Sequence, residues 1–446
     1  MATTYDLVIE APRAVVDGRE DACVVVVRDG RVVGVERFGA TVAAAETVRL
    51  DDDAVLLPGL VDTHVHCNDP GRTDWEGFAH ATRAAAAGGV TTLVDMPLNS
   101  VPPTVDPEAL AAKRDAAHGR CYVDVAFWGG AVPGNTAHLR SLWDAGVLGF
   151  KAFLVDSGVE EFPALDEAGL RRAAETVASF GGLLLVHAED PDAVLPAPAG
   201  DDYAWFAASR PPVAEVEAVR AVVAASRATG CRMHVVHLAA AAALPVVRSA
   251  HDAGVPVTAE TCPHYLALTA ADAPAGDGAF KCCPPLRDAT NRDGLWDGLR
   301  DGTLGLVVSD HSPCPAELKA TGPGGLADAW GGISSLQLGL AVTWTGARQR
   351  DLTLADVARW MATAPADRAG LGRKGRIAEG ADADLCVLAP EETFVVDPHE
   401  LQHRHPVTPY AGRTLAGVVR QTWLAGRPVD LEAPPRGRLL RRGGTP

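Results

Sequence analysis

The sequence predicts an α/β protein, namely a TIM-like (β/α)8 barrel with a small β-sandwich domain built from both chain ends. Eight short apolar segments alternate with amphipathic helical segments through the middle of the chain, as in a barrel of βα units. The apolar segments lack the polar alternation of half-exposed strands, which is typical of parallel strands buried on both faces. Both chain ends are instead rich in β-forming residues.

Each predicted strand is followed by a connecting segment long enough to return to the start of the next strand. The strands are expected at residues 60–66, 91–97, 122–130, 149–154, 183–189, 233–239, 257–265 and 304–312. Helices are expected, among others, at residues 76–87, 107–118, 166–180 and 213–229. An open, doubly wound sheet is the alternative, but no glycine-rich phosphate loop follows the first strand, so we favour the barrel.

The two chain ends are expected to pair into one domain. Valines 24–27, the pair Asp29-Gly30 and the apolar residues 32–35 predict a hairpin with a two-residue turn. Residues 384–388 and 420–424 are also rich in β-forming residues, and neither end alone has enough strands to bury a core. The predicted boundaries are 1–57 for the N-terminal part of the β-sandwich, 58–373 for the barrel, and 374–446 for its C-terminal part and tail.

Composition excludes several classes of function. The chain of 446 residues is 47% hydrophobic and 22% charged, which is ordinary for a soluble globular protein. A net charge of −17 argues against a nucleic-acid partner. No apolar run approaches the roughly 20 residues that cross a membrane, and the N-terminus does not resemble a signal peptide. Nine cysteines without a CxxC pair predict reduced thiols, so we expect a cytoplasmic protein with no membrane partner.

Metal-binding side chains occur at the ends of the predicted strands. His64 and His66 end the first strand and, two residues apart, point to the same face. His187, His237 and Asp310 end the fifth, sixth and eighth strands. Each alone is compatible with a structural role, such as a buried core histidine or a helix N-cap. Because the carboxyl ends of barrel strands share one face, together they suit one or two divalent ions.

Lys151 ends the fourth predicted strand. A cation beside metal ions is repelled, and burying it is costly. One interpretation is a lysine in a salt bridge. The other is a carbamate formed with carbon dioxide, which converts the cation into an anionic ligand.

The remaining histidines carry weaker expectations. His234 should face away from His237, since they are three residues apart on a strand. His264 is expected behind the ligands, and His311 beside Asp310 or the substrate. His403 and His405 are expected on the surface.

These segments resemble those of the amidohydrolase superfamily and, within it, the cyclic amidohydrolases, most of all the allantoinases. The matching segments are PGLVDTHVH at 58–66, DPGRTDWEGF at 69–78, DMPLNS at 95–100, GFKAFL at 149–154, ETCPHY at 260–265, SDHSPCP at 309–315, WGGI at 330–333 and HRHPVTPYAGRT at 403–414. The resemblance covers nearly the whole chain. It implies a β/α barrel with a composite β-sandwich.

The resemblance also implies a binuclear metal centre. The implied ligands are His64, His66, carbamylated Lys151 and Asp310 for one ion, and Lys151, His187 and His237 for the other. Two divalent ions of zinc, cobalt, manganese or iron suit this donor set, with zinc preferred. The nucleophile would be a hydroxide between the ions, with Asp310 as general base and then acid. Family members are commonly homotetramers.

The implied reaction is the hydrolytic opening of the hydantoin ring of allantoin to give allantoate. The expected substrate contacts are Asn99, Cys283, His311 and Gly332; at Cys283 many similar sequences have serine. The loop 314–330, rich in proline and glycine, is either a lid or an ordinary surface connection.

Several alternatives stay open. Dihydroorotases usually have an arginine two residues after the second histidine, where this chain has Asn68. Hydantoinases and dihydropyrimidinases tend to have a tyrosine shortly after the lysine, where this chain has Phe153 and Leu154. A non-catalytic scaffold protein would have lost ligands, and none of the six is missing. A mononuclear deaminase would lack Lys151.

Overall fold

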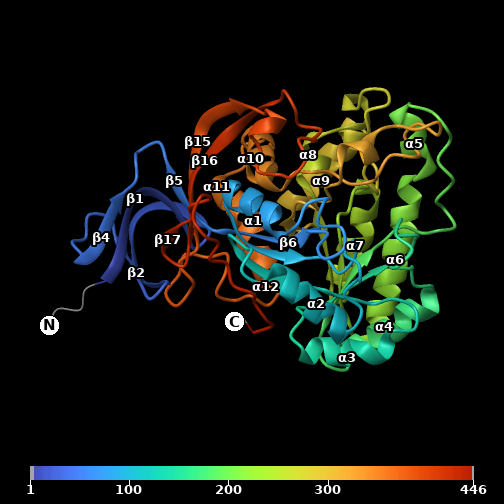
Figure 1. Cartoon of the computed structure of the whole chain (residues 1–446), viewed down its shortest axis with the longest axis horizontal. Coiled ribbons are helices and arrows are strands. Elements are labelled where there is room, and N and C mark those ends of the chain that lie inside the picture. Colours follow the sequence, from blue (N-terminus) through green and yellow to red (C-terminus); the bar gives the residue numbers. More distant parts are fainter. Residues whose placement is uncertain (1–4, 444–446) are drawn as a thin grey trace.

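The parallel strands in the middle of the chain follow one another around a ring in the computed structural model, which describes residues 5–443. Figure 1 shows the strands of the two chain ends on one side of the helix-covered part. One sheet contains β6 (Leu60–Val65), β7 (Val90–Asp95) and β8 (Asp124–Phe127). The other contains β9 (Gly129–Gly130), β10 (Phe150–Phe153), β11 (Leu183–His187), β12 (Arg232–Val235), β13 (Val257–Thr261) and β14 (Leu306–Val307).

The two sheets follow one another around the ring. Only Trp128 separates β8 from β9, and an isolated parallel bridge joins Val65 to His311 at the other junction. At that junction the His66 N–H donates to the His311 carbonyl at 2.8 Å. The hydrogen-bond ladder is interrupted at both places, but the strand order is that of a TIM-like barrel, as predicted.

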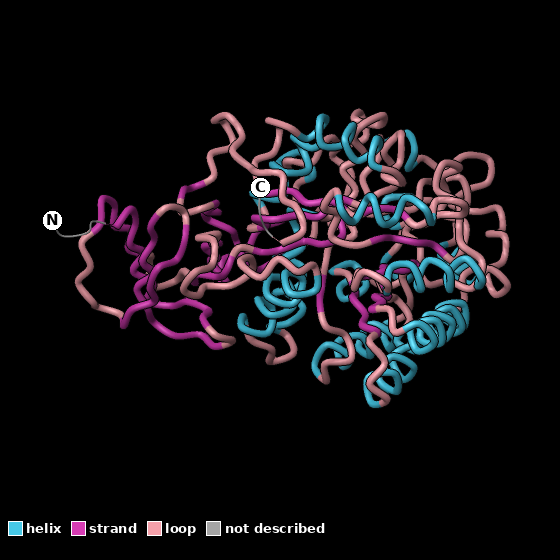
Figure 2. Tube along the Cα trace, turned by 90° about the horizontal axis from the view of Figure 1, so that it is seen from below, coloured by secondary structure: helices cyan, strands magenta, loops and turns pink. Residues whose placement is uncertain are grey.

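Helices surround these strands (Figure 2). They are α1 (Phe78–Ala87), α2 (Pro107–Ala117), α3 (Thr136–Asp144), α4 (Glu167–Ala178), α5 (Tyr203–Ser209), α6 (Pro212–Thr229), α7 (Leu244–Asp252), α8 (Pro263–Ala267), α9 (Ala289–Arg300), α10 (Gly339–Arg348), α11 (Leu354–Ala358) and α12 (Ala364–Arg368). Several of their ends are capped by side chains or by glycine. Asp106 and Asp166 each accept a backbone N–H three residues on, and Gly230 ends α6 with a φ of 70°.

Alternate strand residues contact different apolar clusters. On β11, Leu184 and Val186 belong to the cluster that also includes the helices, whereas Leu183 and Leu185 belong to the smaller cluster inside the ring. His187 follows in the inward series, because side chains two apart share a face. The alternation of side chains along β11 therefore directs His187, its last residue, toward the barrel axis.

Both chain ends pair into one domain, as predicted from their composition, and the strands of the predicted β-sandwich are hydrogen-bonded into one eight-stranded sheet. Its strands are β1 (Tyr5–Val16), β2 (Arg19–Arg28), β3 (Arg31–Arg37), β4 (Ala44–Arg49), β5 (Val55–Pro58), β15 (Leu385–Val395), β16 (Thr414–Leu424) and β17 (Arg427–Pro428). The sheet branches at β1, which pairs with β2, β4 and β5. The antiparallel pair β5–β15 joins the two chain ends. The predicted turn is present, with φ of 51° at Asp29 and 71° at Gly30.

A buried ion cluster links this sheet to the barrel. Lys374 Nζ lies 2.6 Å from Asp124, 3.0 Å from Asp382 and 2.6 Å from Asp384. Arg438 adds a contact of 2.7 Å to Asp124. The three carboxylates have the spacing of a metal site. Three protein cations already neutralise them, since Arg373 Nε also lies 3.5 Å from Asp382, so we assign the cluster a structural role.

The observed strands differ in extent from the predicted ones, and the sixth, predicted at 233–239, already ends at Val235. The strand predicted at 122–130 is broken at Trp128 into β8 and β9. The strand predicted at 257–265 ends at Thr261, because Pro263 occupies the first turn of α8, where a missing N–H costs nothing. The strand predicted at 304–312 is reduced to two residues. All nine cysteines are free thiols, as predicted. No helix among residues 5–443 is long and apolar enough to span a membrane.

Candidate active site

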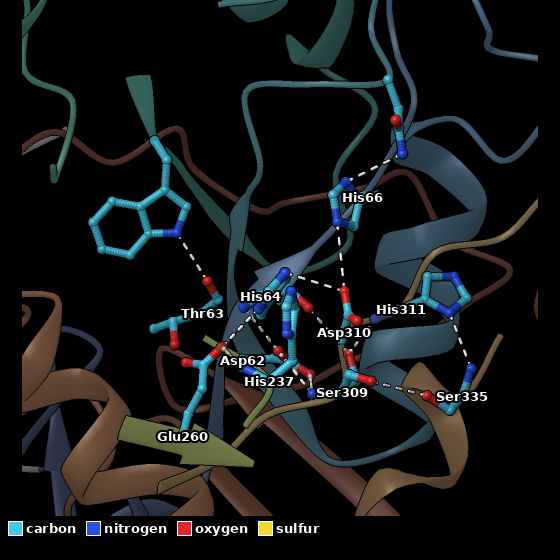
Figure 3. Close-up of polar contacts among 12 residues, drawn as sticks. Asp62, Thr63, His64, His66, His237, Glu260, Ser309, Asp310, His311 and Ser335 are labelled. Atoms are coloured by element: carbon cyan, nitrogen blue, oxygen red, sulfur yellow. Dashed lines mark hydrogen bonds and ion pairs between the residues drawn. The ribbon is translucent and has the colours of Figure 1, made fainter. Parts of the chain in front are cut away.

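The structure brings His64, His66 and Asp310 together at one end of the ring (Figure 3). Asp310 Oδ1 lies 3.1 Å from His64 Nε2 and 3.5 Å from His66 Nε2. One ligand atom from each of the three side chains lies within 4.8 Å of the others. Burial alone would raise the pKa of Asp310, but the adjacent His64 and His66 rings hold it well below its ordinary value.

The other predicted ligands face the same cavity. The ring centroids of His187 and His237 are 4.5 Å apart, and that of His237 is 5.4 Å from His64. All six predicted ligands line one cavity of about 370 Å³. A volume of this size suits a small molecule.

Two of these residues have strained backbones. His237 has a φ of 39° and Asp310 a φ of 46°. Left-handed conformations are costly for non-glycine residues and cluster at functional sites. Both residues lie just beyond their strands, β12 and β14, so the strain re-aims side chains that strand geometry alone would not direct.

Lys151 is a fully buried amine without a hydrogen-bond partner. It lies on β10, where Phe150 and Ala152 face the outer cluster, so Lys151 points inward. Its Nζ lies 4.8 Å from the Phe153 ring centroid and has no polar partner among the described residues. Burial lowers the pKa of Lys151 to about 7, although Asp310 and Glu260 oppose the shift.

The donor set fits a divalent metal centre. Imidazole nitrogens and a carboxylate are ordinary ligands of zinc and of neighbouring transition metals. His237 Nδ1 and Lys151 Nζ are buried polar atoms without partners among residues 5–443, in a protein where such atoms are expected to be satisfied. Coordination of a metal ion by the His237 ring, and by Lys151 as a carbamate, would give both of these atoms a partner.

Glu260 lies behind the cavity and accepts hydrogen bonds from two histidines. Its Oε1 accepts from His64 Nδ1 at 2.6 Å and its Oε2 from His234 Nε2 at 2.9 Å. Burial would raise the pKa of Glu260, but the hydrogen bonds from His234 and His64 hold it at about 2. His234 faces away from the cavity, as predicted, but the sequence analysis did not identify its partner Glu260.

Glu189 has the same relation to His187. His187 Nε2 lies 2.7 Å from Glu189 Oε2, and Arg210 Nη1 donates to the same oxygen at 2.5 Å. Burial would raise the pKa of Glu189, but His187 and Arg210 lower it. Glu189 ends the strand predicted at 183–189, and Glu260 lies within the strand predicted at 257–265, next to last in the observed β13. A carboxylate in an otherwise apolar strand is the signal that could have identified them.

Three of the four predicted substrate contacts line the cavity. Asn99, Cys283 and Gly332 are among the lining residues, and Asn99 Nδ2 lies 3.3 Å from His66 Nδ1. No described residue bonds the backbone N–H or carbonyl of Cys283, so both remain available. Gly332 leaves no space for a side chain, since an added Cβ would lie 2.5 Å from the Ser312 carbonyl.

His311 is not brought to the cavity wall. Its Nδ1 accepts from the backbone N–H of Ser335 at 3.1 Å, and its Nε2 lies 3.7 Å from Glu76 Oε1. It is buried behind Asp310, where it follows the strained backbone (Figure 3). His264 is also buried behind the ligands, as expected, with neither ring nitrogen bonded to a described residue.

The prediction that His403 lies on the surface is wrong. Its side chain is 7% exposed, and its ring centroid lies 4.8 Å from that of His311. Its Nε2 accepts from the backbone N–H of Gln337 at 3.3 Å. The cause is long-range: the segment after β15 folds back over the barrel. His405 is partly exposed and contacts the Asp74 carbonyl at 2.8 Å.

The loop 314–330 forms one wall of the cavity. Lys319 Nζ donates to the carbonyls of Trp330, at 2.8 Å, and Gly332, and Lys281 Nζ donates to that of Ala329 at 2.6 Å. These buried amines hold the loop against the cavity, and its role as a lid stays a prediction.

Comparison with known proteins identifies relatives along the whole chain. A model of the amidohydrolase family matches residues 55–429. An allantoinase of Streptomyces avermitilis is 53% identical, covering 98% of this chain and 99% of that protein. An allantoinase of Saccharomyces cerevisiae is 42% identical, covering 97% of this chain and 95% of that protein. The solved structure of an L-hydantoinase from Arthrobacter aurescens has a TM-score of 0.91 at 30% identity, covering 99% and 98% of the two chains.

Proposed function

The chain belongs to the amidohydrolase family, and we propose that it hydrolyses the hydantoin ring of allantoin to give allantoate. The observation that carries the proposal is the convergence of four histidines, a lysine and an aspartate on one cavity. The allantoinase relatives, similar over nearly their full length, support allantoin as the substrate.

We propose that this convergent set holds two divalent ions. His64, His66 and Asp310 would hold one, His187 and His237 the other, and Lys151 as a carbamate would contact both. Ions bound there would acidify a water molecule and polarise the amide carbonyl. The partnerless, buried Nζ of Lys151 supports the carbamate.

The chain's own groups would guide the proton and the ring. Water adds its oxygen to the ring carbonyl carbon, the C–N bond breaks, and the leaving nitrogen needs a proton. The Asp310 carboxylate would accept the proton of the attacking water and return it to that nitrogen. The free backbone groups of Cys283 and the Asn99 amide would orient the ring, and Gly332 lines the same cavity.

A hydantoinase or dihydropyrimidinase activity is the second candidate, favoured by the close structural match to an L-hydantoinase. Hydrolysis of allantoin, hydantoin, dihydrouracil and dihydroorotate by metal-loaded, bicarbonate-treated protein decides between the two. We expect turnover of allantoin to exceed that of the others. Preference for hydantoin or dihydrouracil would favour the second candidate. No turnover of any with two metals bound would contradict both.

We further propose zinc as the metal, a homotetramer and a cytoplasmic location. The donor set supports zinc. Elemental analysis of the isolated protein and its molar mass in solution test the first two, and cell fractionation tests the third.

A further inference from the structure

Glu189 fixes which nitrogen of His187 faces the cavity. The carboxylate accepts a hydrogen bond from His187 Nε2 at 2.7 Å, so that nitrogen carries the proton and Nδ1 keeps its lone pair. Glu189 is completely buried, and Arg210 Nη1 donates to the same carboxylate oxygen at 2.5 Å. A ring held in this way is pre-oriented for a metal ion.

The support behind Arg210 extends to the neighbouring ligand. The Arg210 carbonyl accepts from Arg287 Nη1 at 3.1 Å, and Arg287 Nη2 donates to Glu215 Oε1 at 2.6 Å. Glu215 Oε2 in turn accepts the backbone N–H groups of Ala239 and Ala240, at 2.8 and 3.0 Å. Those residues follow closely after His237. The Glu189 network (Glu189, Arg210, Arg287 and Glu215) therefore contacts His187 directly and the backbone that follows His237.

Glu260 belongs to a separate set of contacts. It bonds His64 Nδ1 at 2.6 Å, which leaves His64 Nε2 beside Asp310 (Figure 3). It also bonds His234, whose Nδ1 contacts the Thr258 hydroxyl at 2.7 Å. The Glu260 network (Glu260, His234 and Thr258) thus orients a histidine assigned to the other ion. Glu260 Oε1 also accepts a longer hydrogen bond, at 3.4 Å, from the backbone N–H of His237, which is assigned to the same ion as His187.

We propose that Glu189 and Glu260 are positioning residues, each of which supports a different ion of the binuclear centre. The inference rests on the proposed function for its assignment of ligands to ions. It goes beyond that function because it predicts that the affinity for each ion can be lowered separately by substitutions that leave all six ligands unchanged.

Zinc binding to purified protein tests the inference without substrate. Wild type, Glu189→Gln and Glu260→Gln are loaded with zinc in bicarbonate, and bound zinc per chain is followed against a competing chelator. In Glu189→Gln we expect one zinc to bind about 10- to 100-fold more weakly and the other as in wild type. Glu260→Gln should weaken the opposite zinc. Lys374→Met, in the distant ion cluster, controls for loss of stability alone.

A double substitution identifies which zinc is affected. If Glu189 acts through His187, the variant Glu189→Gln/His187→Asn should bind zinc as His187→Asn does. The variant His66→Asn should retain one tightly bound zinc, the one held by His187 and His237. Adding Glu189→Gln to this variant should remove that tight binding as well. Unchanged zinc affinity in Glu189→Gln, or equal weakening of both zinc ions, would overturn the inference.

Substitutions of Arg210 separate positioning from packing. Arg210→Lys retains a cation beside Glu189 and should lose less zinc affinity than Arg210→Met, at similar thermal stability. Equal losses in the two variants would contradict the role of Arg210. A wild-type protein that binds two zinc ions but does not hydrolyse allantoin would contradict the proposed function and leave this inference intact.

Discussion

At the scale of single residues, Lys151 departs most from the usual behaviour of its type. A lysine is almost never fully buried without a partner, yet Lys151 has no exposed surface and no polar contact among the described residues. Conversion to a carbamate would remove the cation and give the site an anionic ligand. The position of Lys151 in the inward series of β10 makes it reachable from the cavity.

Lys151→Arg tests this role, because arginine keeps the charge but cannot form the carbamate. We expect allantoin turnover to fall by at least about 1000-fold, equivalent to about 4 kcal/mol of barrier, and bound metal to fall with it. Lys113→Arg, at a buried lysine paired with Asp95, is the matched control. Wild-type turnover in Lys151→Arg would exclude the carbamate.

His403 should make stability depend on pH. Burial lowers its pKa to about 3, with His311 adding to the shift and Glu76 opposing it. Between the unfolded value of about 6.5 and this folded value, the unfolded chain binds more protons, so stability falls as pH drops below about 6.5. From pH 7 to pH 5 the loss should be about 2 kcal/mol.

Urea unfolding of wild type and His403→Gln at the two pH values measures this contribution. The variant should lose less stability between pH 7 and pH 5, since glutamine does not titrate. Other titrating groups are common to both proteins and cancel in the comparison. Equal pH dependence in the two proteins would rule out the contribution of His403.

At the scale of elements, strand ends are the most predictable feature of the site. The hydrophobic period of the sequence and the alternation of side chains along a strand are enough to place His64, Lys151 and His187 on the inner face. His237 and Asp310 were also predicted from the ends of their predicted strands, but they lie beyond the observed strands and reach the cavity through positive φ, so strand alternation alone does not explain where they point. The buried position of His403 could not be predicted, because a distant segment creates it.

Buried lysine amines hold the loop 314–330 in place. Lys319 donates to the carbonyls of Trp330 and Gly332, and burial lowers its pKa to about 8. Lys319→Met should leave these carbonyls unpaired, at a cost of about 1–3 kcal/mol. We expect proteolytic cleavage within 314–330 to accelerate by about 10-fold or more, together with a higher KM. Glu317→Gln, an exposed change in the same loop, is the control. Cleavage of Lys319→Met at the wild-type rate would show that the lysine does not fasten the loop.

At the scale of the whole molecule, the barrel and the composite sheet are joined by charge as well as by apolar contact. The pairing of both chain ends was predictable, because neither end could form a core alone. The Lys374 cluster that fastens the sheet to β8 was not, since Asp124 lies 250 residues from Lys374 in the sequence. The predicted domain boundaries stay a prediction.

Lys374→Met should destabilise the molecule by about 3–5 kcal/mol, because it leaves Asp124, Asp382 and Asp384 buried with Arg438 as a remaining close cation. Chemical unfolding measures the change. Neutralising one carboxylate in Lys374→Met/Asp384→Asn should restore part of the loss. A single variant as stable as wild type would show that the cluster contributes little.

The most direct test of the proposed chemistry is a zinc titration of metal-free, bicarbonate-treated protein, with allantoate formation and bound zinc measured on the same samples. We predict that hydrolysis of allantoin appears as the second zinc binds and reaches its maximum at two per chain. Full activity in the metal-free protein, or no activity with two zinc ions bound, would contradict a binuclear allantoin-hydrolysing centre.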